Sequence, residues 1–130
     1  MLRILVCDDE PIAVGRLTAL LGRLTEVEVV ATAANGDEAL SAFHSSRPDL
    51  ILLDIEMPGL DGFDVMGEIS RLAGDRPPFV TFVTAFRHFA PDAFNSGAVD
   101  FLSKPVRLSR LEKSVERARR LVASHRRRHG

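Results

Sequence analysis

Five short apolar runs alternate with segments of helical spacing along the 130-residue chain. The runs are residues 2–7, 27–32, 49–54, 79–83 and 99–102. Alternation of this kind is typical of βαβ units, in which helices cover both faces of a parallel sheet. Because 130 residues fit one domain of ordinary size, the pattern predicts a single α/β domain.

The segments between the runs carry signals for helices. Pro11 suits the first turn of a helix, where its missing N–H costs nothing, and Asp61 suits the N-cap of a third helix. Ser109 and Glu112 have the form of a capping box that opens a fifth helix. Residues 85–97 form the weakest helical pattern. Two inner faces are expected, made by Leu17, Leu20, Leu21 and Leu24 and by Val65, Met66, Ile69 and Leu72.

Composition excludes some classes of protein. No apolar stretch approaches the ~20 residues that a membrane span requires. Cys7 is the only cysteine, so an internal disulfide is impossible and a reducing compartment, the cytoplasm, is expected. Cys7 itself is expected to be a small buried residue of a central strand, although a redox role is the alternative.

Charge is distributed unevenly along the chain. Residues 1–103 hold 7 basic and 16 acidic side chains, a net charge of −9, whereas residues 104–130 hold 10 basic and 2 acidic ones, a net charge of +8. The acidic body would repel nucleic-acid phosphates, so direct binding of nucleic acid by the body is not expected. The basic residues of 123–130 are interpreted as a solvated tail or the start of a linker, with a nucleic-acid contact as the alternative.

Chemically compatible polar residues follow four of the apolar runs. Asp8 and Asp9 follow the first run, Asp54 ends the third, Thr84 follows the fourth, and Lys104 lies just after the fifth. The carboxyl ends of parallel strands share one edge of a sheet, which is where α/β proteins bind ligands. Three neighbouring carboxylates call for a divalent cation, and a hydroxyl and an ammonium would complete a site for a phosphoryl group. Taken alone, the acid pair could simply cap the first helix.

These motifs, in this order, resemble the receiver domain of bacterial two-component response regulators. The resemblance rests on Val6–Pro11, Leu53–Gly62, Thr84–Ala85 and Lys104–Pro105, and it covers residues 1 to about 122. Residues 84–106 are also similar to receivers attached to LytTR-type DNA-binding domains. The resemblance implies a doubly wound, five-stranded parallel sheet of order 2-1-3-4-5, the flavodoxin-like order.

The resemblance also implies residue roles. Asp54 would be the phosphoacceptor, and Thr84 and Lys104 would contact the phosphoryl oxygens. Phe101 would be the switch aromatic, and the Lys104–Pro105 bond would be cis. Mg²⁺ would be bound by four groups: Asp9, Asp54, the backbone carbonyl of Glu56, and Asp8 through water.

The implied activity is signalling. A sensor histidine kinase would phosphorylate Asp54, and the domain would catalyse only its own phosphorylation and dephosphorylation. Phosphorylation would repack the face made by helix 4, strand 5 and helix 5, which would then pair with a second copy. An output domain, expected to bind DNA and expected to lie outside this chain, would be controlled in this way. The body itself is expected to contact neither nucleic acid nor a membrane.

Two alternatives belong to other classes. Haloacid-dehalogenase-like phosphatases also use Asp, Thr or Ser, Lys and Mg²⁺, but they need a second Asp two residues after the nucleophile, where this chain has Glu56. A receiver-like module that works without phosphate is the other alternative, and it is disfavoured because no site residue is missing. Glu56 and Phe86 either tune the reactivity of the site from its rim or point outward without effect.

Overall fold

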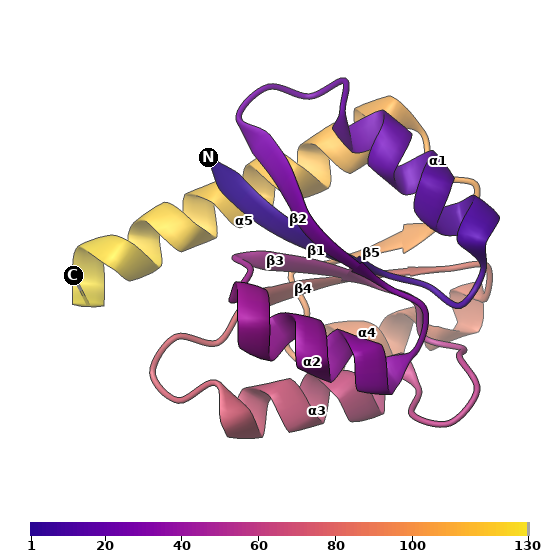
Figure 1. Ribbon diagram of the computed structural model, residues 1–130. Helices are drawn as coiled ribbons and strands as arrows, with labels where there is room; N and C mark the ends of the chain where they lie inside the picture. The colour runs from indigo at the N-terminus through magenta and orange to yellow at the C-terminus, as the bar shows by residue number, and fades with distance from the viewer. Residues whose placement is uncertain (130) are drawn as a thin grey trace.

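The computed structural model describes residues 1–129 and contains a parallel sheet of five strands in the order β2-β1-β3-β4-β5 (Figure 1). The expected fold class and strand order are confirmed. The ends of the strands agree with the predicted runs to within one residue. The strands are β1 (Leu2–Cys7), β2 (Val27–Ala33), β3 (Leu50–Leu53), β4 (Phe79–Thr84) and β5 (Asp100–Ser103).

Helices form a layer on each face of the sheet (Figure 1). One layer consists of α1 (Pro11–Leu21) and the long α5 (Leu108–His129). The other consists of α2 (Gly36–Ser46), α3 (Gly62–Leu72) and the short α4 (Ala90–Asn95), which a 3₁₀ turn at Arg87–Phe89 precedes. Among the described residues, no helix is both long and apolar enough to span a membrane.

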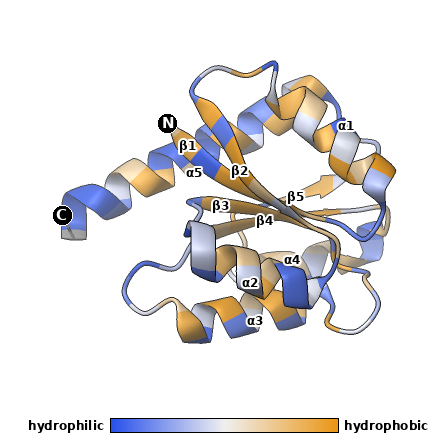
Figure 2. Ribbon diagram, in the orientation of Figure 1, coloured by the Kyte–Doolittle hydropathy of each residue, from blue (hydrophilic) through white to orange (hydrophobic). Residues whose placement is uncertain are grey.

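The sheet separates two hydrophobic cores, because successive side chains of a strand point to opposite faces. In β3, Ile51 and Leu53 pack under α2 and α3, whereas Leu50 and Leu52 pack under α1 and α5. Both faces of β3 are therefore apolar, as expected for a strand of a parallel sheet that is covered on both sides. Figure 2 shows the apolar centre of the sheet and the hydrophilic C-terminal turns of α5.

Local signals explain where several helices begin. The Asp61 carboxylate accepts a hydrogen bond from the N–H of Asp64 at 2.8 Å, and the Asp64 carboxylate accepts one from the N–H of Asp61 at 3.0 Å. This reciprocal capping box confirms Asp61 as the N-cap of α3. Pro11 occupies the first turn of α1, also as predicted.

Three predictions about the helices are wrong. Ser109 does not cap α5, because α5 begins at Leu108 and the Arg107 carbonyl accepts its first hydrogen bonds. Leu72 is 51% exposed: its spacing places it on the same face of α3 as Val65, but it is the last residue of the helix and belongs to neither hydrophobic core. Leu24 lies beyond the end of α1, although it still packs against the core.

The C-terminal helix does not end where the domain was predicted to end. Helix α5 continues without a break past Val122 to His129. The assignment of 1–122 to the domain and 123–130 to a tail or linker stays a prediction, and Gly130 lies outside the described residues.

Candidate functional site

The predicted site residues lie together at the carboxyl edge of the sheet. The parallel registers pair Cys7 with Leu53, the last residues of β1 and β3, and they pair Thr84 with Ser103, the last residues of β4 and β5. Leu53 pairs with Phe82, so β4 extends two residues further than β3 at this edge. Backbone hydrogen bonds continue this alignment beyond the strands, from the N–H of Asp54 to the Cys7 carbonyl at 3.0 Å and from the N–H of Lys104 to the Thr84 carbonyl at 2.9 Å. The Lys104–Pro105 peptide bond is cis.

Four carboxylates converge at this edge. Each of Asp8, Asp9, Glu10 and Asp54 offers one oxygen, and these oxygens all lie within 4.8 Å of one another. Asp8 and Asp54 are buried, Asp9 is half-buried and Glu10 is exposed. Glu10 was not predicted as a site residue, and the signal that could have identified it is its place directly after Asp8 and Asp9.

Lys104 lies among these carboxylates. Its Nζ is 2.7 Å from Oδ2 of Asp8, 3.4 Å from Oδ2 of Asp54 and 3.5 Å from Oε1 of Glu10. Burial alone would lower the pKa of Lys104, but the attraction of Asp8 and Asp54 outweighs burial and raises it. The lysine therefore stays charged and partly neutralises the acidic cluster.

The carboxyl group of Asp54 is unusually hard to ionise. Burial raises its pKa to about 6, repulsion from Asp8 adds to this effect, and the nearby Lys104 ammonium only partly offsets it. Burial and the neighbouring Asp8 likewise raise the pKa of the Cys7 thiol to about 12. Since the thiolate is the reactive form, Cys7 is an inert core residue, in line with the interpretation of its sequence position.

The cluster fits a divalent cation. Four carboxylates gather around a single ammonium group, that of Lys104, so the negative charge of the cluster is only partly neutralised. Carboxylate oxygens are the ligands that Mg²⁺ prefers. Oxygens of Asp8, Asp9 and Asp54 are close enough together to bind one ion. The role of the Glu56 carbonyl stays a prediction; the Glu56 side chain is exposed.

The expected switch residues lie on the next two strands of the sheet, Thr84 on β4 and Phe101 on β5. Thr84 is fully buried, and its Oγ1 accepts a hydrogen bond from the N–H of Phe86 at 3.3 Å. Phe101 is half-buried against the core under α2, α3 and α4. Phe86 is 42% exposed and Phe94 is 54% exposed, so neither belongs to the core.

Gly62 holds the loop that follows Asp54 close to the start of α3. Its N–H donates to the carbonyl of Ile55 at 2.8 Å. A Cβ at this position would lie 2.5 Å from the backbone oxygen of Asp54 and 2.9 Å from Cα of Ile55. Only glycine permits this close approach of two backbone segments.

Residues 4–116 match the family model described as the response regulator receiver domain. The chain belongs to this family. The receiver domain is 43% identical over 120 residues to the positive alginate biosynthesis regulatory protein of Pseudomonas aeruginosa, and 40% identical over 119 residues to the transcriptional regulatory protein BtsR of Salmonella typhi. Each alignment covers 92% of this chain but 48% of the relative, so the chain spans about half the length of these curated relatives.

Solved structures agree with this membership. The response regulatory domain of mrkE from Klebsiella pneumoniae has a TM-score of 0.79 and 28% identity, with 97% of this chain and 99% of that chain covered. The signal receiver domain of the putative response regulator NarL from Mycobacterium tuberculosis has a TM-score of 0.81 and 30% identity, with 91% and 96% covered. The receiver domain thus has the fold of other receivers over nearly all of its length.

Proposed function

We propose that Asp54 accepts a phosphoryl group from the phosphohistidine of a sensor histidine kinase. The observation that supports this best is the placement of the buried Asp54 carboxylate 3.4 Å from Lys104, beside Asp8. A carboxylate oxygen attacks phosphorus, the bond from phosphorus to the imidazole nitrogen breaks, and an acyl phosphate forms. The histidine is the leaving group, so no further reactant is needed.

The neighbouring side chains supply the electrostatics of this transfer. Lys104 lies where it can stabilise negative charge on the transferred group, and the Thr84 hydroxyl can donate a hydrogen bond to one phosphoryl oxygen. Asp8, Asp9 and Asp54, with the carbonyl of Glu56, would hold Mg²⁺, which would supply charge neutralisation for the phosphoryl oxygens. The hydrolysis that resets the switch would use the same groups.

The phosphorylated state would be transmitted through Thr84 and Phe101. When the Thr84 hydroxyl turns toward the phosphoryl group it must leave the N–H of Phe86, and Phe101 can then move deeper into the core. These movements would alter the face formed by α4, β5 and α5, which then pairs with a second copy. Exposed charges of both signs lie along α5 and directly before it: Arg107, Arg110, Glu112, Lys113, Glu116 and Arg117.

The output of the switch is proposed to lie outside this chain. The relatives above are described as regulatory proteins and are about twice as long as the aligned region. We infer that the receiver controls a DNA-binding output domain of the LytTR type, while the acidic body itself contacts neither nucleic acid nor a membrane. A cytoplasmic location, where a kinase would meet the receiver, belongs to the same proposal.

Incubation with acetyl phosphate and Mg²⁺, followed by intact-mass spectrometry, tests the phosphoacceptor. One phosphoryl group should be added to the wild type and none to Asp54→Asn. Asp75→Asn, which removes an exposed acid at the other end of the sheet, should be phosphorylated as the wild type is. Modification that persists in Asp54→Asn, or that is equally fast without Mg²⁺, would contradict the proposal.

A further inference from the structure

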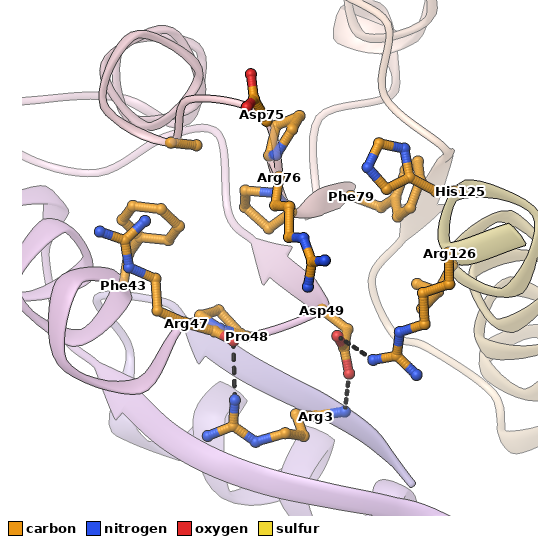
Figure 3. Close-up of a pocket in the computed structure, with 14 residues that line it drawn as sticks. Arg3, Phe43, Arg47, Pro48, Asp49, Asp75, Arg76, Phe79, His125 and Arg126 are labelled. Carbon is orange, nitrogen blue, oxygen red and sulfur yellow. Dashed lines mark hydrogen bonds and ion pairs between the residues drawn. The ribbon is translucent and has the colours of Figure 1, made fainter. Parts of the chain in front are cut away.

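A large cleft lies at the edge of the sheet opposite Asp54 (Figure 3). Its volume is about 610 Å³, which is within the range of about 300–1,000 Å³ that small-molecule sites occupy. Four separate segments form its walls: the start of β1, the end of α2, the loop between α3 and β4, and the C-terminal part of α5. The cleft shares no residue with the phosphoacceptor site.

Positive charge is concentrated in this cleft. Residues 1–103 have a net charge of −9, yet three of their seven basic residues, Arg3, Arg47 and Arg76, line the cleft, and Arg126 of α5 joins them. Only two acids line it. Asp49 accepts hydrogen bonds from Arg126 at 3.2 Å and from the N–H of Arg3 at 2.9 Å, and the carboxylate of Asp75 points away from the guanidinium groups (Figure 3).

Three of the four guanidinium groups have no carboxylate partner. Nη1 of Arg3 donates to the carbonyl of Arg47 at 2.9 Å, and the guanidinium of Arg47 lies 4.7 Å from the ring centroid of Phe43. Arg76 lies on the loop between α3 and β4, and its side chain extends into the cleft (Figure 3). Among residues 1–129, none of these three arginines has an ion pair.

The backbone of Arg47 is also unusual. As the residue that ends α2 it has φ 46° and ψ 64°, the left-handed conformation in which glycine is the common residue. An arginine there strains the backbone but places a guanidinium at the edge of the cleft. The floor beside it is apolar, since Pro77, Pro78 and Phe79 contribute to the lining.

We propose that this cleft binds a small phosphorylated molecule with a planar ring, the chemical class of a nucleotide. Arg47 and Arg76 would contact the phosphate, because the planar, forked guanidinium matches phosphate geometry. The ring would lie on the apolar floor that Phe79 and the two prolines provide. Because Arg126 lines the same cleft, an occupant would connect the body of the domain with the C-terminal turns of α5.

Titration calorimetry with ADP as the probe, on the full chain in metal-free buffer with chelator, tests the proposal. The wild type should bind ADP saturably, and Arg76→Gln and Arg47→Gln should each weaken binding at least fivefold. Arg71→Gln is the matched control, because Arg71 is an exposed arginine of α3 that pairs with Glu68 outside the cleft, and it should bind as the wild type does. Asp54→Asn should also leave binding unchanged.

Separate titrations with pyrophosphate and with adenosine test the phosphate contact and the ring contact individually. Both should bind at least fivefold more weakly than ADP. Affinity for pyrophosphate equal to that for ADP would overturn the ring contact, and affinity for adenosine equal to that for ADP would overturn the phosphate contact. Absence of saturable ADP binding at millimolar concentration, or equal binding by Arg76→Gln, would overturn the site itself.

Discussion

Asp100, at the start of β5, is a buried carboxylate whose ionised form depends on one arginine. Nη1 and Nη2 of Arg110 donate to its two oxygens at 2.8 and 2.7 Å, and the N–H of Phe101 donates at 2.8 Å. Burial alone would raise the pKa of Asp100, but the hydrogen bonds from Arg110 and Phe101 outweigh burial and lower it. Asp100 therefore stabilises the fold above its unfolded pKa of 3.8, and this contribution is lost as pH falls through the lower folded value.

Replacing Arg110 should show that the contribution of Asp100 to stability depends on this arginine and on pH. Arg110→Met should lower the free energy of unfolding at pH 7 by about 1.5 kcal/mol, the low end for hydrogen bonds to charged groups, because Arg110 is 46% exposed. The difference from wild type should shrink as pH falls below the unfolded pKa of 3.8, and it should be lost once pH is below the lower folded pKa of Asp100, where this carboxyl is protonated in both proteins. Urea unfolding across this pH range gives the measurement. Arg71→Met, which breaks only an exposed pair, should change little, and a pH-independent loss in Arg110→Met would contradict the linkage.

A single methyl group at Gly62 should disturb the phosphoacceptor loop. The Cβ of Gly62→Ala would meet backbone atoms of Asp54 and Ile55, which can move only if the loop moves. We expect a loss of about 1–3 kcal/mol in stability and slower phosphorylation by acetyl phosphate. Gly67→Ala is the control: it lies in the same helix with no atom within 4 Å of its Cβ, and should stabilise the protein by about 0.5–1 kcal/mol. Equal effects of the two substitutions would contradict this prediction.

Helix α3 begins with a reciprocal capping box. The side chains of Asp61 and Asp64 each accept from the backbone of the other residue, whereas α1 begins without a side-chain cap. Asp61→Ala should cost about 1 kcal/mol of stability, measured by urea unfolding, because a backbone donor loses its partner. Asp61→Asn keeps an acceptor oxygen and should recover most of the loss. If the asparagine variant is as unstable as the alanine one, the charge near the helix N-terminus matters rather than the hydrogen bond.

The elements also differ in how firmly they are held. Helix α5 is anchored over its first half by the buried Leu111, Val115 and Ala118. Its second half contacts the body through the partly buried Val122, a hydrogen bond from Arg119 to the Thr25 carbonyl, and the ion pair of Arg126 with Asp49. Helix α4 has six residues, with Pro91 in its first turn, and Ala93 is its buried side chain. A short helix held by so little burial is the kind of element that can move at low cost. This supports placing the switch at the α4 end of the molecule.

For the whole molecule, phosphorylation is predicted to drive dimerisation through the face of α4, β5 and α5. Beryllofluoride with Mg²⁺, a mimic of the acyl phosphate, should shift the sedimentation coefficient from monomer to dimer at tens of micromolar protein. Since the face carries charges of both signs, added salt should weaken association. Arg117→Glu, on the exposed side of α5, should weaken the dimer without changing phosphorylation. A monomer in both states would mean that output proceeds by release of inhibition instead.

Much of this architecture follows from local pattern. Buried strands read as continuous apolar runs, so β1, β3 and β4 were recognisable without any tertiary information. The side chain of Asp61, a preferred N-cap residue, predicted the start of α3. Helix boundaries that rest on a single polar residue were harder to predict. Ser109 has capping chemistry, yet α5 begins at Leu108, and Leu111 and Val115 pack against the sheet. Leu72 has the spacing of a buried residue, and its exposure follows from its place at the last residue of α3.

The phosphoacceptor site could be predicted from the sequence, whereas the arginine-lined cleft depends on the tertiary structure. The sequence predicted that four residues lie together: Asp8, Asp54, Thr84 and Lys104. They follow the ends of parallel strands, and parallel strands bring their carboxyl ends to one edge of the sheet independently of the loops between them. The sequence does not predict that Arg3, Arg47 and Arg76 meet, because they come from three separate segments that the fold brings together. The length of α5 adds Arg126 to the same cleft. Periodicity determines which residues are buried, and only packing between distant elements decides which charged side chains share a cleft.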